Sequence, residues 1–99
     1  MLNIEKQTNE SALTVALSGR LDTTTAPELE KELKESLDGV NALTIDMKDL
    51  DYISSAGLRV LLSAQKIMNK QGGMKVVHVS ETIMEIFEVT GFSDILVIE

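Results

Sequence analysis

Two adjacent serines, Ser54 and Ser55, are the side chains of this 99-residue sequence best placed to do chemistry. They stand where the short apolar run at Tyr52-Ile53 gives way to a helical pattern. A serine oxygen at a helix start commonly accepts hydrogen bonds from the free backbone N–H groups of the first turn. A serine hydroxyl can also accept a phosphate group. The pair is therefore either a helix cap alone or a cap combined with a phosphorylation site.

The other reactive side chains do not form a catalytic set. His78, the single histidine, falls inside a predicted strand and is expected to be a half-buried or surface residue instead of a general base. Ser55 lies in Ile-Ser-Ser-Ala-Gly, which lacks the first glycine of a serine hydrolase motif. No Walker lysine or paired-histidine metal motif is present, so a nucleotide-binding or hydrolysing protein is disfavoured. Four aspartates fall near predicted strand ends and are interpreted as a solvated acidic rim: Asp22, Asp46, Asp49 and Asp51. We expect no enzyme, no cofactor and no metal.

Composition excludes several classes of partner. The formal net charge of -7 opposes binding to a phosphate backbone, so no direct nucleic acid or anionic membrane partner is expected. The sequence has no cysteine, which excludes disulfides and a thiolate zinc site. It opens without a basic segment followed by an apolar one, and its apolar run at residues 95–98 is far shorter than the ~20 residues of a membrane helix. These features predict a cytoplasmic protein without membrane insertion.

Periodicity predicts the elements that position the serines. Alternating apolar residues indicate strands, and apolar residues at helical spacing indicate amphipathic helices. Strands are predicted over residues 3–8, 11–18, 42–47, 74–79 and 95–98, and helices over residues 26–37, 55–71 and 81–90. Thr25-Ala-Pro-Glu28 has capping-box spacing. Gly19 is expected to end the second strand, residues 48–51 to turn the chain, and Gly72-Gly73 to stop the second long helix.

The predicted order is β-β-α-β-α-β-α-β, which is typical of an α/β protein. Right-handed crossovers place successive strands side by side, with the first strand antiparallel at one edge. We therefore expect a single domain over residues 1–99, with a mixed, mostly parallel sheet of about five strands and three main helices. With 43% apolar and 25% charged residues, the chain is expected to fold alone as a monomer.

The segment Tyr52-Ile-Ser-Ser-Ala-Gly-Leu-Arg-Val-Leu-Leu62 resembles the STAS domain of anti-sigma factor antagonists. Leu17-Ser-Gly-Arg-Leu-Asp22 and Gly72-Gly73 extend the resemblance over nearly the whole chain. In that family a hydroxyl residue two places before the Gly-Leu-x-Val segment is phosphorylated, which corresponds to Ser55. Many members carry aspartate immediately before it, where this sequence has Ser54, so Ser54 is a second candidate acceptor.

The resemblance implies a partner-switching protein. Its unphosphorylated form would bind an anti-sigma factor that is also a serine protein kinase, freeing a sigma factor, and phosphorylation of Ser55 would end that binding. A serine phosphatase would restore the first state. The residues expected at the docking surface are Asp22, Thr23, Thr24, Ser54, Ser55, Leu58 and Arg59. The alternative is a constitutive STAS subunit of a transport or other signalling complex, in which Ser55 is never modified.

Overall fold

The computed structural model describes residues 1–99 as a four-stranded sheet with two helices on one face and a third helix beyond the end of the last strand. The elements in chain order are β1 (Leu2–Asn9), β2 (Ala12–Leu21), α1 (Ala26–Ser36), β3 (Ala42–Ile53), α2 (Ser55–Gln71), β4 (Met74–Val77), α3 (Glu81–Thr90) and a short 3-10 helix η1 (Phe92–Asp94). The strands lie in the order β1-β2-β3-β4. β1 is antiparallel to β2, whereas β2, β3 and β4 are mutually parallel. The predicted strand order and antiparallel edge are thereby confirmed.

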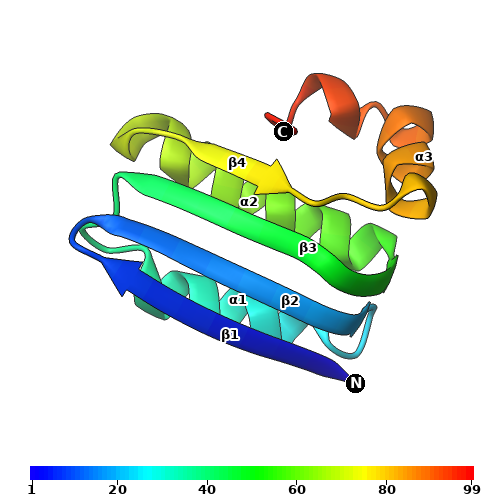
Figure 1. The fold of residues 1–99 in the computed structure, drawn as a ribbon, viewed down its shortest axis with the longest axis horizontal. Coiled ribbons are helices and arrows are strands. Elements are labelled where there is room, and N and C mark those ends of the chain that lie inside the picture. The colour runs from blue at the N-terminus through cyan, green and yellow to red at the C-terminus, as the bar shows by residue number, and fades with distance from the viewer.

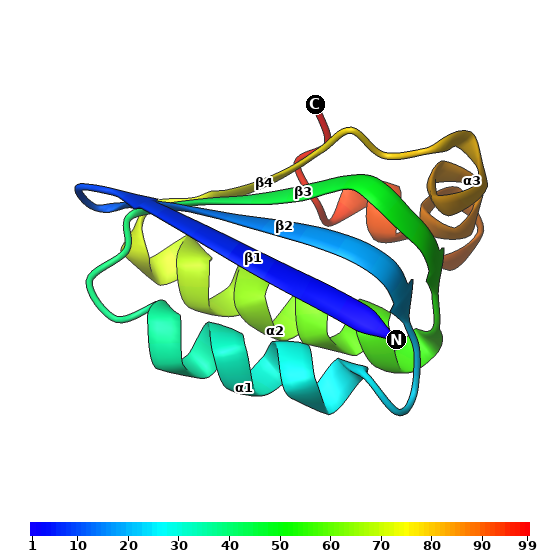
Figure 2. The same ribbon diagram turned by 60° about the horizontal axis from the view of Figure 1, so that its bottom comes forward.

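The two crossover helices α1 and α2 cover the same face of the sheet (Figures 1 and 2). The alternation in β2 places Leu13, Val15 and Leu17 under these helices, where each is at most 3% exposed. On α2, buried residues recur from Gly57 to Met68, so this helix is embedded along most of its length. All 25 buried apolar residues form one cluster, which makes the sheet–helix interface the core of the protein.

The predicted fifth strand at residues 95–98 is wrong, because the sheet has four strands. The end of the chain makes a single parallel bridge from Ile98 to Val76, flanked by Val76 N–H donating to Val97 O at 2.8 Å and Glu99 N–H donating to Val76 O at 2.9 Å. η1 and Ile95 have helical backbone, and β4 has only four residues. Too little extended chain therefore remains on either side to form a ladder.

The second and third strands are longer than predicted. Gly19 does not end β2, and residues 48–51 do not turn the chain, because β2 and β3 stay paired as far as Leu21 and Ile53. Two irregularities in the pairing, between Ala16 and Ser18 and between Gly19 and Arg20, allow the longer pairing. Gly19 adopts a φ of +95°, and an added Cβ there would lie 2.1 Å from the carbonyl oxygen of Met1. The extension carries both strands to the start of α2.

Helix ends follow the predictions except at α1. α2 spans the predicted residues and ends at Gly72, and Ser80 caps α3 by accepting a hydrogen bond from Ile83 N–H at 3.3 Å. Thr25 makes no capping hydrogen bond to α1, so the predicted capping box is wrong. Its hydroxyl instead donates to Arg20 O at 2.8 Å. Its oxygen accepts from Asp22 N–H at 2.8 Å. Together these two bonds fix the approach to α1 from β2, and the second uses the oxygen that would have capped the helix.

Candidate functional site

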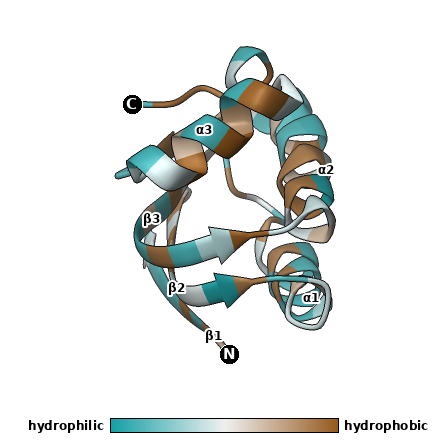
Figure 3. Cartoon of the chain, turned by 90° about the vertical axis from the view of Figure 1, so that its right-hand side faces the viewer, coloured by the Kyte–Doolittle hydropathy of each residue, from teal (hydrophilic) through white to brown (hydrophobic).

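The two serines lie at the junction of β3 and α2, at the end of the molecule that Figure 3 faces. Ser54 N–H donates to Leu21 O at 2.9 Å, which ties the junction to the end of β2. The Ser54 side-chain oxygen accepts from Gly57 N–H at 3.4 Å, and its carbonyl accepts from Leu58 N–H at 2.9 Å. Ser54 is therefore the helix cap. Ser55 is the first residue of α2, is exposed and makes no side-chain hydrogen bond, so its hydroxyl is free.

Gly57 fixes the position of this first turn. An added Cβ at Gly57 would lie 2.7 Å from Leu21 Cγ and 3.0 Å from Ile53 Cγ1, the last residues of β2 and β3. Both distances are shorter than ordinary carbon–carbon contact. Only glycine lets the helix start this close to the strand ends, and Ser55 is thereby held two residues away on the solvent side.

The loop before α1 is organised around the Asp22 carboxylate. Oδ1 accepts from Thr24 N–H at 3.0 Å, from the Thr24 hydroxyl at 2.8 Å and from Thr25 N–H at 3.1 Å. These bonds, led by the one from the Thr24 side chain, lower the pKa of Asp22 from 3.8 to about 2. Asp22 therefore remains charged at any pH at which the protein is expected to work, and Thr23 and Thr24 are held exposed beside it.

Thr24→Val removes the hydroxyl donor but leaves the backbone N–H, so the pKa of Asp22 should rise from about 2 toward 3.8. The folded-state pKa lies below the ordinary value, so the carboxylate stabilises the fold above about pH 4, and that contribution is lost as pH falls through about 2. An NMR titration of the Asp22 carboxyl carbon measures the change. Thr23→Val is the matched control, because Thr23 makes no side-chain hydrogen bond; equal rises in both variants would contradict the assignment.

Sequence reasoning missed two residues at this end of the sheet. Arg20 and Tyr52 are cross-strand partners, and the Arg20 guanidinium carbon lies 4.4 Å from the Tyr52 ring centroid. Arg20 Nε also lies 3.7 Å from Asp22 Oδ2. Tyr52 is 37% exposed, so the pair offers both a cation and an aromatic ring to solvent. Both strands were predicted to stop before these residues. Had the two strands been extended, Arg20 and Tyr52 would have been recognised as neighbours on adjacent strands.

Of the three α2 residues predicted for the docking surface, Ser55 and Arg59 are exposed but Leu58 is not. Leu58 is 5% exposed and belongs to the core, so it supports the helix and does not face a partner. Arg59 is exposed and lines a groove of about 340 Å³ between the starts of α1 and α2, opposite Thr23. The exposed part of the predicted surface is therefore Thr23, Thr24, Ser55 and Arg59, with Asp22 and Ser54 half-buried among them.

The aspartates do not all join this site. Asp49 and Asp51 are exposed on the last half of β3, but Asp46 faces His78, with 3.0 Å between Asp46 Oδ1 and His78 Nδ1. Burial raises the pKa of Asp46, yet the bonds from Lys48 N–H and His78 outweigh it and the pKa is lowered. His78 follows β4, with a φ of 57°, so its predicted place inside the strand is wrong. Its side chain is 61% exposed.

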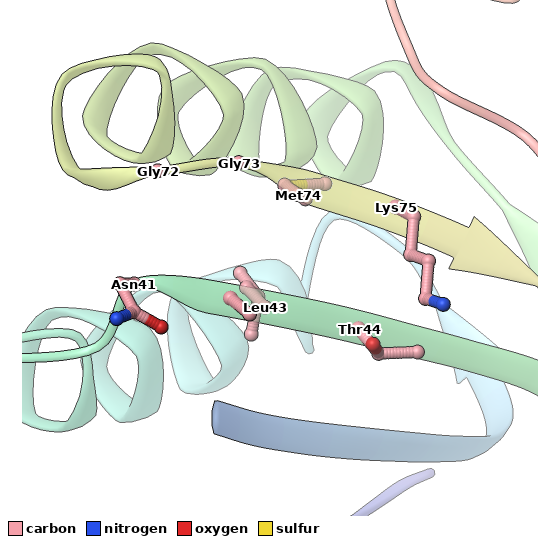
Figure 4. Close-up of a pocket in the computed structure, with 8 residues that line it drawn as sticks. Asn41, Leu43, Thr44, Gly72, Gly73, Met74 and Lys75 are labelled. Carbon is pink, nitrogen blue, oxygen red and sulfur yellow. The ribbon is translucent and has the colours of Figure 1, made fainter. Parts of the chain in front are cut away.

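A second hollow of about 340 Å³ lies at the opposite end of the strands, between the start of β3 and the Gly72–Lys75 segment (Figure 4). Asn41, Thr44 and Lys75 are the only polar side chains on its wall, and they supply no pair of acid and base.

No group of three or more His, Cys, Asp or Glu side chains is placed to hold a metal ion. None of the helices has the length and apolar character needed to cross a membrane.

The fold and the site define a small α/β domain that presents a free serine hydroxyl on the first turn of an embedded helix. Residues 3–99 match the family described as STAS domain, and the chain belongs to that family. The anti-sigma-B factor antagonist of Bacillus subtilis (strain 168) is 34% identical over 96 residues, which cover 96% of this chain and 88% of the relative. The family resemblance read from the sequence is confirmed.

Solved structures share the fold. An anti-sigma factor antagonist from Mycobacterium paratuberculosis superimposes with a TM-score of 0.89 at 24% identity, covering 99% of this chain and 85% of that one. The Bacillus cell fate determinant SpoIIAA in its phosphorylated form superimposes with a TM-score of 0.75 at 15% identity, covering 100% of this chain and 91% of that one. The predicted α/β architecture is thereby supported along the whole chain.

Proposed function

We propose that this protein is an anti-sigma factor antagonist whose binding is controlled by phosphorylation of Ser55. The observation that carries the proposal is the division of roles between the two serines. Ser54 is occupied as the cap of α2, whereas Ser55 is exposed and its hydroxyl has no partner. A kinase therefore meets one available acceptor at this junction. Membership of the STAS family and the likeness to the Bacillus antagonist support the same role.

In the unphosphorylated state the protein binds an anti-sigma factor that is also a serine protein kinase, and so frees the sigma factor in the cytoplasm. The docking surface consists of Asp22, Thr23, Thr24, Ser54, Ser55 and Arg59, with Arg20 and Tyr52 at its edge. Phosphorylation ends the complex, and a serine phosphatase reverses it. The protein acts by binding and catalyses no step itself.

The site can accept a phosphate without unfolding. A helix N-terminus carries about half a unit of positive charge and unpaired N–H groups, which favour an anion there. α2 has no acidic residue in its first turn, so the helix itself offers no like charge to the new group. The phosphate instead alters the surface, by adding roughly -1.5 to -2 charges near Asp22, whose lowered pKa keeps it charged at neutral pH.

Intact mass spectrometry after incubation with ATP and the cognate anti-sigma factor tests the proposal. Wild type and Ser54→Ala should each gain one phosphate, whereas Ser55→Ala should gain none. Because loss of the cap is expected to cost about 1 kcal/mol, circular dichroism should show that Ser54→Ala is folded. Phosphate gained equally by Ser55→Ala would refute the assignment. Stable binding with no phosphate on wild type would instead indicate the constitutive STAS subunit.

A further inference from the structure

Arg59 is a cation without a partner on the same face of α2 as Ser55. It follows Ser55 by four residues, which is the spacing that places two side chains one above the other on a helix. Arg59 is exposed and makes no hydrogen bond or ion pair. The other arginine of this region, Arg20, is already in contact with Tyr52 and Asp22.

The surroundings of Arg59 leave it available. It lines the groove between α1 and α2, whose opposite wall includes Thr23 and Glu30. Glu30 makes no ion pair with Arg59, and its carboxylate instead lies 3.7 Å from Lys34 Nζ on its own helix. The unphosphorylated docking surface therefore presents a free guanidinium beside the acceptor hydroxyl, although the protein as a whole is acidic.

We propose that phosphate on Ser55 forms an intramolecular ion pair with Arg59 and so withdraws Arg59 from the docking groove. This inference rests on the proposed function, since it assigns a second component to the same switch. Guanidinium groups bind phosphate through two parallel hydrogen bonds. An anion placed four residues before a cation is also the favourable order along a helix.

The ion pair gives the switch two effects from one modification. A partner carboxylate that binds Arg59 in the unphosphorylated state loses that contact when the phosphate takes it. The same partner then meets the new negative charge. Arg59 is thus a specificity-determining residue of the docking surface, as well as the internal receptor for the phosphate.

The test is a ³¹P NMR titration of protein carrying phosphoserine at position 55, installed by chemical ligation so that no kinase is needed. The second pKa of a phosphoserine is about 6, and a guanidinium that binds the dianion lowers it. We expect this pKa to be lower in wild type than in Arg59→Gln by about half a unit or more. The negative charges of Asp22 and Glu30 raise the phosphoserine pKa, and the helix N-terminus lowers it. These effects are the same in wild type and in Arg59→Gln, so they cancel when the two proteins are compared.

Lys66→Gln is the matched control, because it removes the same charge from the exposed face of the same helix. Lys66 lies eleven residues beyond Ser55, about 16 Å along the helix axis, and should be screened at ordinary salt. Its phosphate should titrate like that of wild type. Coincident titrations of wild type and Arg59→Gln would overturn the ion pair and leave the proposed function standing. If no kinase modifies Ser55, the proposed function is overturned, whereas the ion pair in the chemically phosphorylated protein is unaffected.

Discussion

Phosphate on Ser55 is expected to lower the affinity of the protein for its anti-sigma factor by about 100-fold or more, which is about 2.7 kcal/mol. Two unit charges about 4 Å apart at an effective dielectric of about 20 interact by about 4 kcal/mol. A phosphate of nearly two charges facing one partner carboxylate exceeds the required energy even after substantial screening by salt. Ser55 is exposed beside the charged Asp22, so the phosphate is added where a partner must approach.

Isothermal titration calorimetry measures this effect across a short series. Ser55→Ala should bind like wild type, Ser55→Asp should lose part of the affinity, and the phosphorylated protein should lose most. Asn9→Asp is the control for net charge, because Asn9 is exposed at the end of β1, beside the start of β2, whereas Ser55 lies near the far end of β2. Equal affinities for wild type, Ser55→Asp and the phosphorylated form would eliminate the switch.

Gly72→Ala is expected to destabilise the fold by about 3 kcal/mol, which combines backbone strain with overpacking. Gly72 ends α2 with a φ of +153°, a conformation that other residues rarely adopt. An added Cβ would lie 2.0 Å from the carbonyl oxygen of Asn41 and 2.9 Å from its carbonyl carbon. Both are backbone atoms of the residue just before β3, so neither can move aside as a flexible side chain would.

Gly73→Ala is the matched control, since an added Cβ there meets nothing within 4 Å and Gly73 has no positive φ. It should change the free energy of unfolding by less than about 0.5 kcal/mol. Urea unfolding followed by circular dichroism compares the two variants, and the melting temperature of Gly72→Ala should fall by on the order of 15 °C. Similar losses at both glycines would show that the contact with Asn41 relaxes at little cost.

The helices were predictable because their signals are local. For α2 the apolar period, the serine cap and the Gly72-Gly73 stop all occur within the helix or next to it, and its predicted bounds are those observed. The strand order followed from the crossover rule alone. Consistent local preferences of this kind specify an element before any long-range contact is known.

The strands were less predictable because their ends depend on a neighbour. Nothing local in residues 48–51 marks them as paired, and they remain in β3 because β2 continues alongside through irregular pairing near Gly19. Residues 95–98 have the composition of a strand, but only Ile98 among them pairs with β4, through a single bridge to Val76. A strand requires a partner of matching length, which a single segment of sequence does not reveal.

The site divides in the same way. Its location at the start of α2 could be predicted from the serines and the following glycine, but their separate roles could not, because either serine has the chemistry of a cap. Leu58 was assigned to the surface from its place in the motif, whereas the rotation of α2 buries it. Tyr52 was missed as a partner of Arg20 because that contact exists only once the two strands are paired.

The contact between Gly57 and the ends of β2 and β3 also determines how a signal can leave this protein. With Leu21 and Ile53 directly beneath Gly57, the first turn of α2 cannot move closer to the sheet when Ser55 is modified. The backbone is therefore expected to be the same before and after modification. The two states differ in chemistry at constant shape, so the partner must recognise charge, and any large movement in the pathway belongs to the partner.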